Sequence, residues 1–187
     1  MKYFYGDIEL EIPEGVYEPR EDSLLLAGAV KGICNKNILE VGCGSGLISI
    51  ILGKENKVTA VDINKEAVLV TKENAERNGI KAEVFQSDLF ERVKGKFDLV
   101  VFNAPYLQDR DKIEGSETWS NKGTIEKFVK GVEKFLEKNG RVLIVISSLT
   151  GVERVRELFK KEGFETEIKK EEKVPWERLV VLEAKVL

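Results

Sequence analysis

One stretch of the chain decides the fold: Ile38-Leu39-Glu40-Val41-Gly42-Cys43-Gly44-Ser45-Gly46. A strand of buried character leads into three glycines at alternate positions, and a helical segment follows from Leu47 to about Lys54. Glycine has no Cβ atom, so such a turn can bend tightly and let a ligand lie against its backbone. A strand, a glycine-rich turn and a helix in this order predict a nucleotide-binding α/β unit.

The spacing of the glycines narrows the choice of ligand. In the dinucleotide fingerprint G-x-G-x-x-G, the third glycine stands where this chain has Leu47. Glu40 lies two residues before the first glycine, and a carboxylate there repels a pyrophosphate but suits an ammonium group. S-adenosylmethionine carries an ammonium group and no phosphate. We therefore expect this cofactor at Glu40, Gly42, Gly44 and Gly46; the alternative is a glycine turn without a ligand.

Composition limits the chemistry. The chain has 187 residues, which favours one main domain (16–187) with a small N-terminal hairpin extension (1–15). It contains no histidine, so His-based catalysis and His metal sites are excluded, and Cys34 and Cys43 show no metal-ligand or disulfide spacing. The net charge of −3 argues against duplex nucleic acid as the main substrate. Frequent Lys and Glu resemble thermophile composition.

The sequence also bears on location. No run approaches the roughly 18 apolar residues of a membrane span, and the first residues lack a signal-peptide profile. We expect a cytoplasmic protein with no membrane partner.

Strand and helix patterns alternate along the chain. They predict a single-domain Rossmann-like α/β fold with a seven-stranded sheet, mainly parallel, helices on both faces and an antiparallel last strand. After a hairpin at residues 2–12, the expected helices are 21–32, 47–54, 65–77, 124–138 and 152–162. The expected strands are 38–41, 57–62, 82–86, 97–102, 141–148, 164–169 and 178–187, with a long polar loop at 107–122.

Acidic residues follow two of the predicted strands. Asp62 lies twenty residues after Gly42, where an acid meets ribose hydroxyls in nucleotide-binding α/β folds, and Ile63 adjoins it. Asp88 and Leu89 follow the next strand, where the Asp88 carboxylate could accept a hydrogen bond from an adenine amino group. The alternative for Asp88 is a residue that caps its loop.

The tetrapeptide Asn103-Ala104-Pro105-Tyr106 follows the most apolar strand. Pro105 keeps Ala104 extended, so the Ala104 carbonyl has a fixed direction. This carbonyl and the Asn103 side-chain carbonyl are two acceptors suited to a planar NH2 group, on which Tyr106 can lie flat. Acceptors that hold both N–H groups stabilise the nitrogen as it becomes positive during methyl transfer. The alternative is a plain strand-ending turn.

These motifs, in this order, resemble a class I S-adenosylmethionine-dependent methyltransferase. The segment Val16-Tyr17-Glu18-Pro19-Arg20-Glu21-Asp22-Ser23 is similar to the entry motif of the release-factor glutamine methyltransferase family, in its eukaryotic and archaeal branch. The resemblance implies methylation of the glutamine of a Gly-Gly-Gln motif in a peptide-chain release factor. It also implies cofactor contacts at Ser23, Glu40, Gly42, Asp62, Asp88 and Leu89, and a substrate-amide clamp at Asn103, Ala104, Pro105 and Tyr106.

Two departures from that family concern the substrate. Ala104 replaces a proline, and Thr118–Gly123 lacks a glycine pair of the family's Trp-containing loop.

The family further implies a small zinc-binding activator protein at the edge strand Ala82–Gln86. Two rival functions remain, namely N6-adenine methylation of DNA or RNA and a non-catalytic cofactor-binding module.

Overall fold

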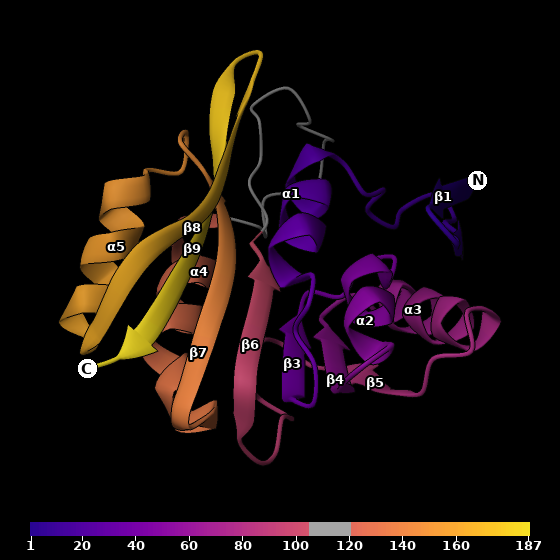
Figure 1. The fold of residues 1–187 in the computed structure, drawn as a ribbon, viewed down its shortest axis with the longest axis horizontal. Coiled ribbons are helices and arrows are strands. Elements are labelled where there is room, and N and C mark those ends of the chain that lie inside the picture. Colours follow the sequence, from indigo (N-terminus) through magenta and orange to yellow (C-terminus); the bar gives the residue numbers. More distant parts are fainter. Residues whose placement is uncertain (105–120) are drawn as a thin grey trace.

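The fold is known from a computed structural model, which describes residues 1–104 and 121–187 (Figure 1). Pro105, Tyr106 and the predicted loop as far as residue 120 lie outside the described residues. No helix in the described part of the chain is both long and apolar enough to cross a membrane.

A seven-stranded sheet forms the centre of the molecule, as predicted. Its strand order is β5-β4-β3-β6-β7-β9-β8. The first five strands in this order, β5, β4, β3, β6 and β7, run parallel to one another. Only two residues connect β8 to β9, which is too few for a parallel crossover, so these strands pair antiparallel. β9 also runs antiparallel to its other neighbour, β7. The strands are β3 (Asn37–Val41), β4 (Lys57–Asp62), β5 (Ala82–Gln86), β6 (Phe97–Asn103), β7 (Leu136–Ser147), β8 (Phe164–Val174) and β9 (Glu177–Val186).

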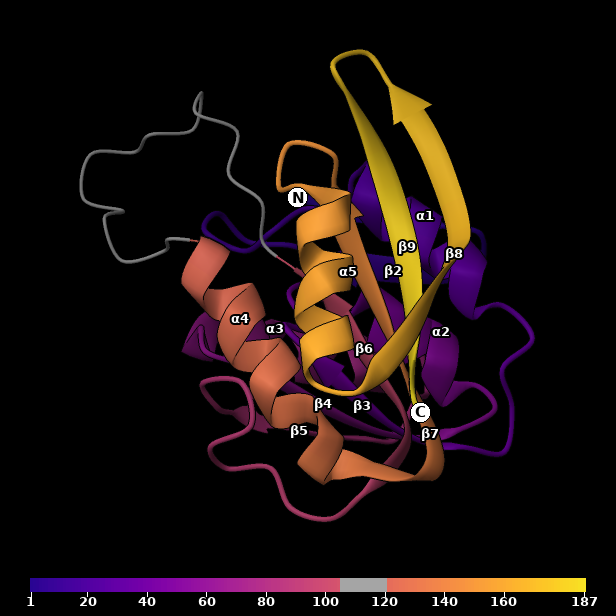
Figure 2. The ribbon, with the colours of Figure 1, turned by 90° about the vertical axis from the view of Figure 1, so that its left-hand side faces the viewer.

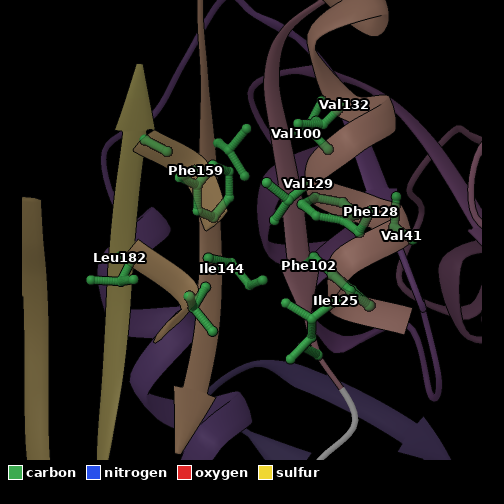
Figure 3. Close-up of a cluster of buried hydrophobic side chains, with 14 of the residues drawn as sticks. Val41, Val100, Phe102, Ile125, Phe128, Val129, Val132, Ile144, Phe159 and Leu182 are labelled. Atoms are coloured by element: carbon green, nitrogen blue, oxygen red, sulfur yellow. The ribbon is translucent and has the colours of Figure 1, made fainter. Parts of the chain in front are cut away.

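Helices cover both faces of this sheet (Figure 2). One face carries α1 (Glu21–Val30), α2 (Leu47–Gly53) and α3 (Lys65–Arg77), and the other carries α4 (Asn121–Val132) and α5 (Val152–Lys161). Because successive strand residues point to opposite faces, Leu99 and Val101 pack toward α1 and α2 while Val100 and Phe102 pack toward α4. Figure 3 shows the cluster of buried side chains between the sheet and helices α4 and α5, in which the ring centroids of Phe102 and Phe128 lie 4.6 Å apart.

The fourth predicted helix ends earlier than expected. Instead of reaching residue 138, α4 gives way to a short 3-10 turn, η1 (Glu133–Phe135), and β7 begins at Leu136. Leu136 pairs with Phe97, while Arg141 pairs with Leu99, so the chain between them bulges. A Cβ atom on Gly140 would lie 2.8 Å from the Phe97 carbonyl oxygen. The backbone at Gly140 therefore lies close against β6, and the pairing with β6 replaces the predicted helical turn.

The N-terminal hairpin consists of β1 (Lys2–Tyr5) and β2 (Ile8–Glu11) and forms a sheet of its own. Its apolar side packs against α2 and α3 in a third cluster of buried side chains. Two side-chain amides, one in α3 and one on the residue that caps its C-terminal end, also bind the β2 backbone. Asn78 pairs with both backbone groups of Glu9, and Asn74 does the same with Glu11. The hairpin therefore rests on the helices beside the glycine turn.

Candidate active site

The glycine turn after β3 has the conformation that its sequence requires. Gly42, Gly44 and Gly46 have φ values of 72°, 52° and 87°, in the left-handed region that side chains disfavour. The N–H groups of Gly42 and Cys43 donate to the Val61 carbonyl at 2.8 and 3.1 Å, which fixes the turn against β4. The ligand-facing role of the three glycines stays a prediction, but their backbone is shaped as the prediction needs.

Asp62 lies at the end of β4 beside this turn. One carboxylate oxygen accepts from the Gly44 N–H at 3.0 Å and the other from the Asn64 N–H at 2.9 Å. Burial raises the pKa of Asp62, and these backbone donors oppose the rise. Each oxygen can still accept a further hydrogen bond. Asp62 thus ties the glycine turn to β4 while keeping capacity for a hydroxyl ligand.

Glu40 is buried under α2, with 3% of its surface exposed. Its carboxylate receives a hydrogen bond from the Ser49 hydroxyl of α2. Burial raises the pKa of Glu40 to about 8, the Ser49 hydrogen bond counters this, and the neighbouring charge of Asp62 adds to it. A cation bound nearby would favour the ionised form. Because burial disfavours the ionised forms of these two adjoining acids, a cationic ligand would stabilise them and a phosphate would not.

The predicted adenine-side residues follow β5. Asp88 is exposed, and Leu89 has a φ of 46°, a strained conformation for a residue other than glycine. The Ser87 N–H donates to the Asp62 carbonyl at 2.9 Å, and the Gln86 side chain donates to the Ile63 carbonyl at 2.9 Å. These links hold the ends of β4 and β5 together, so the acids after both strands share one edge of the sheet.

A second polar cluster joins the end of β6 to the start of α1. The Asn103 Nδ2 donates to Asp22 Oδ2 at 3.0 Å and to Ser23 Oγ at 3.2 Å. The Tyr17 hydroxyl donates to the same Asp22 carboxylate at 3.0 and 3.1 Å. Asp22 is only 2% exposed. The entry segment and the tetrapeptide, some eighty residues apart, therefore meet through side chains.

This cluster lies against the glycine turn. A Cβ atom on Gly42 would be 3.9 Å from the Asn103 carbonyl oxygen, and one on Gly44 would be 4.0 Å from the Tyr17 Cβ. The predicted residues Ser23 and Asn103 thus come together with Gly42 and Gly44. Ala104 is buried in the apolar cluster under α4.

Several residues of this neighbourhood were missed from the sequence. Asp22 was named only as part of the entry segment and was given no role in the site, yet it is the acceptor for Tyr17 and Asn103. Thr71 and Asn74 of α3 bind the Gly44 and Ser45 carbonyls at 3.0 and 2.9 Å. A signal existed for the last two, because Thr71, Asn74 and Asn78 recur at helical spacing on one face of α3. No comparable signal marked Asp22.

Comparison with known proteins agrees with this geometry. The model of the methyltransferase small domain matches residues 19–173. The chain belongs to this methyltransferase family. It is 41% identical over 187 aligned residues, 95% of each chain, to a protein of Methanocaldococcus jannaschii whose name provisionally assigns it as a protein N5-glutamine methyltransferase.

Two solved structures share the fold of this methyltransferase. The E. cuniculi Mtq2–Trm112 complex, responsible for methylation of the eRF1 translation termination factor, has a chain with a TM-score of 0.76 and 24% identity, covering 92% of this chain and 99% of that one. The T. thermophilus 16S rRNA N2 G1207 methyltransferase, bound to AdoMet and guanosine, has a TM-score of 0.75 and 20% identity. This chain spans its whole length but only 50% of that enzyme. S-adenosylmethionine is the cofactor of the methyltransferase described here.

Proposed function

We propose that this methyltransferase transfers a methyl group to the side-chain amide nitrogen of a glutamine. The observation that carries the proposal is the state of Asn103. Both acceptors of its NH2 group belong to α1, and its Oδ1 is buried without a hydrogen-bond partner among the described residues. A buried carbonyl oxygen without a donor is costly, so a donor from a substrate is the expected occupant.

An amide NH2 group matches this acceptor. The lone pair of an amide nitrogen is delocalised, and acceptors on its N–H groups make it available as the nitrogen becomes positive. When bound, S-adenosylmethionine supplies a methyl group on a cationic sulfur, so the N–C bond forms with the nitrogen lone pair while the C–S electron pair stays on sulfur. Asn103 accepts a hydrogen bond but is not a base, so the surplus proton leaves the nitrogen for water.

The cofactor would lie along the carboxyl edge of β3, β4 and β5. The glycine turn offers its backbone at Gly42, Gly44 and Gly46, and the carboxyl groups of buried Glu40 and partly buried Asp62 favour a cationic ligand over a phosphate. In this proposal Glu40 and Ser23 serve the methionine end, Asp62 and Ile63 the ribose, and Asp88 and Leu89 the adenine. Pro105 and Tyr106 complete the amide clamp with Asn103 and Ala104.

A peptide-chain release factor is the proposed substrate protein. The M. jannaschii relative is named for glutamine methylation, and the E. cuniculi structure is described as methylating a termination factor. The rival substrate is a nucleobase amino group, which the T. thermophilus enzyme's description illustrates and which could also donate to Asn103 Oδ1. The chain's net charge of −3 favours the protein substrate.

A small activator protein is proposed to bind at β5. This strand ends the sheet, and an unpaired strand edge can take up a strand from another chain. Beside it lies a hollow of about 430 Å³ whose apolar lining comes from Val58, Ala75, Ile80 and Ala82. The E. cuniculi enzyme was solved as a complex with Trm112, a precedent for such a partner.

The substrate can be tested with methyl-tritiated S-adenosylmethionine. The purified methyltransferase would be offered a release factor, the same factor with its Gly-Gly-Gln glutamine replaced by alanine, and ribosomal RNA. We expect label only in the unaltered factor. Label in the alanine variant would mean that another residue of the release factor is methylated. Label in RNA alone would favour a nucleobase amino group as the methyl acceptor. Running the assay with and without the activator protein shows whether the activator is needed.

A further inference from the structure

The strongest unexplained feature is the buried acid Asp22 behind Asn103. Its carboxylate is almost fully buried, and among the described residues no cation pairs with it. Burying a carboxylate in this way is costly unless its lone pairs are satisfied. The described contacts satisfy them entirely with neutral donors, so the site keeps a negative charge close to the substrate position.

Every group around Asp22 donates to it. Oδ1 receives the Ser23 N–H at 2.6 Å and the Ser23 hydroxyl at 3.2 Å, and Oδ2 receives the Asn103 NH2 at 3.0 Å. The Tyr17 hydroxyl lies within 3.1 Å of both oxygens. An ionised carboxylate only accepts hydrogen bonds, which matches this set. The Ser23 hydroxyl, which donates to Asp22, is left to accept from Asn103.

This arrangement fixes which end of the Asn103 amide faces the substrate. In the flipped orientation the Asn103 oxygen would face an acceptor-only carboxylate, and its NH2 group would point toward the substrate's own NH2 group. Both contacts would be repulsive. The observed orientation satisfies both NH2 hydrogens and leaves Oδ1 as a buried acceptor without a hydrogen-bond partner among the described residues.

We propose that Asp22 is a positioning residue for methyl transfer: it holds Asn103 with Oδ1 toward the substrate amide and polarises that oxygen through the shared hydrogen bond. Polarisation along a hydrogen-bonded chain strengthens each link in a low-dielectric site. The Asp22 carboxylate also stabilises the substrate nitrogen as it becomes positive, so it lowers the energy of the transition state more than that of the bound substrate. The proposal rests on the proposed role of Asn103 as substrate acceptor.

Replacement of Asp22 by asparagine gives the sharpest test. The two side chains have the same shape, but asparagine has an NH2 group in place of one carboxylate oxygen. Its single remaining oxygen cannot accept hydrogen bonds from both Asn103 and Ser23. The Asn103 amide should then lose its fixed orientation. We expect kcat to fall about a hundredfold, as for a misplaced or missing acceptor. The KM for S-adenosylmethionine and cofactor affinity by calorimetry should stay unchanged.

The matched control is Glu21→Gln. Glu21 is an exposed acid one residue earlier on α1, so this change removes the same charge from the same helix end without touching Asn103. It should leave kcat unchanged. An equal loss of kcat in Glu21→Gln and Asp22→Asn would make the effect one of helix-end charge and would overturn the positioning role.

A spectroscopic measurement separates this proposal from the proposed substrate. In 15N-labelled protein, the two side-chain N–H signals of Asn103 should shift and exchange faster in Asp22→Asn, while those of Asn74 stay in place. Unmoved Asn103 signals would overturn the inference, whatever the activity. Failure of the wild-type enzyme to label a release factor would instead reject the substrate and leave the Asn103 signals as the test of Asp22.

Folding is controlled with a second variant. Asp22→Ala removes the carboxylate without adding a misplaced donor, and it should reproduce both the kcat loss and the shift of the Asn103 signals. Thermal unfolding of both variants checks that they fold. If both variants fail to fold, Asp22 serves the fold and the positioning role is wrong.

Discussion

The two faces of the central sheet differ in what they bury. Among the described side chains, α4 and α5 contribute no buried polar group, and their cluster is aliphatic and aromatic. The opposite face buries polar groups close to the glycine turn. Those on its helices are Asp22, Ser23, Ser49, Thr71 and Asn74. Both faces bury apolar clusters that hold the fold, and because burying polar groups stabilises little, we infer that the α1–α3 face in addition holds the site.

The largest effect should come from the apolar face. Phe159 of α5 is fully buried (Figure 3). Its ring meets that of Phe164 edge to face at a centroid distance of 5.4 Å. Phe159→Ala should lower the free energy of unfolding by about 3–5 kcal/mol in chemical denaturation, because it removes buried area and leaves a cavity. Phe159→Leu, which keeps most of the volume, should cost less. The kcat of both variants, measured well below their melting temperatures, should match wild type; a large loss would blur the contrast between the faces.

The reverse behaviour is expected at Asn103. Asn103→Ala removes the proposed acceptor and should lower kcat by about 10²–10³-fold, the usual cost of one such group, with little change in melting temperature. Cofactor affinity by calorimetry should persist, since the glycine turn and Asp62 are untouched. A variant that no longer binds cofactor would show that Asn103 serves the cofactor and would break its assignment to the substrate.

An intermediate effect should appear at Glu40, and its sign depends on pH. Burial raises the pKa of Glu40 from 4.5 to about 8. Between these values the folded state holds a proton that the unfolded state releases, so wild-type stability falls as the pH rises. Glu40→Gln removes this loss, so its stability relative to wild type should rise with pH through that window.

Melting curves of the cofactor-free protein at several pH values would measure this gain. The difference between Glu40→Gln and wild type should vanish below pH 4.5 and level off above pH 8. Glu55→Gln, at an exposed position just after α2, is the matched control and should follow wild type. Parallel curves for Glu40→Gln and wild type would mean that the buried acid carries no cost.

Local patterns in the sequence were sufficient for the sheet. The apolar strands and the glycine turn predicted the seven strands and the antiparallel end of the sheet, although β8 runs to Val174, where a strand ending at residue 169 was predicted. The end of α4 was predicted wrongly, because its helical pattern runs to residue 138. That segment instead pairs with β6, a contact between residues distant in the sequence, in which Leu136 lies opposite Phe97 and Arg141 opposite Leu99.

The polar contacts of the site were harder to foresee. Asn103 was recognised from the chemistry of an amide after a buried strand, but Asp22 becomes informative only when α1 lies across the end of β6. No local pattern encodes that meeting, since Asp22 is also a good residue for any helix start. The roles assigned to the site residues therefore remain predictions, while their placement along one sheet edge follows from the parallel strands.

The smallest effect should occur where polar groups on the α1–α3 face bind the hairpin instead of the site. Asn78, which caps the C-terminal end of α3, receives the Glu9 N–H at 3.1 Å and donates to the Glu9 carbonyl at 2.8 Å. Asn78→Ala should cost about 1 kcal/mol of unfolding free energy, because the freed Glu9 groups can turn to water. Amide hydrogen exchange in β2 should quicken, with kcat unchanged. Exposed Asn139→Ala is the control. A fall in kcat with Asn78→Ala alone would show that the hairpin contributes to the active site, and the polar groups of this face could then not be divided into two sets.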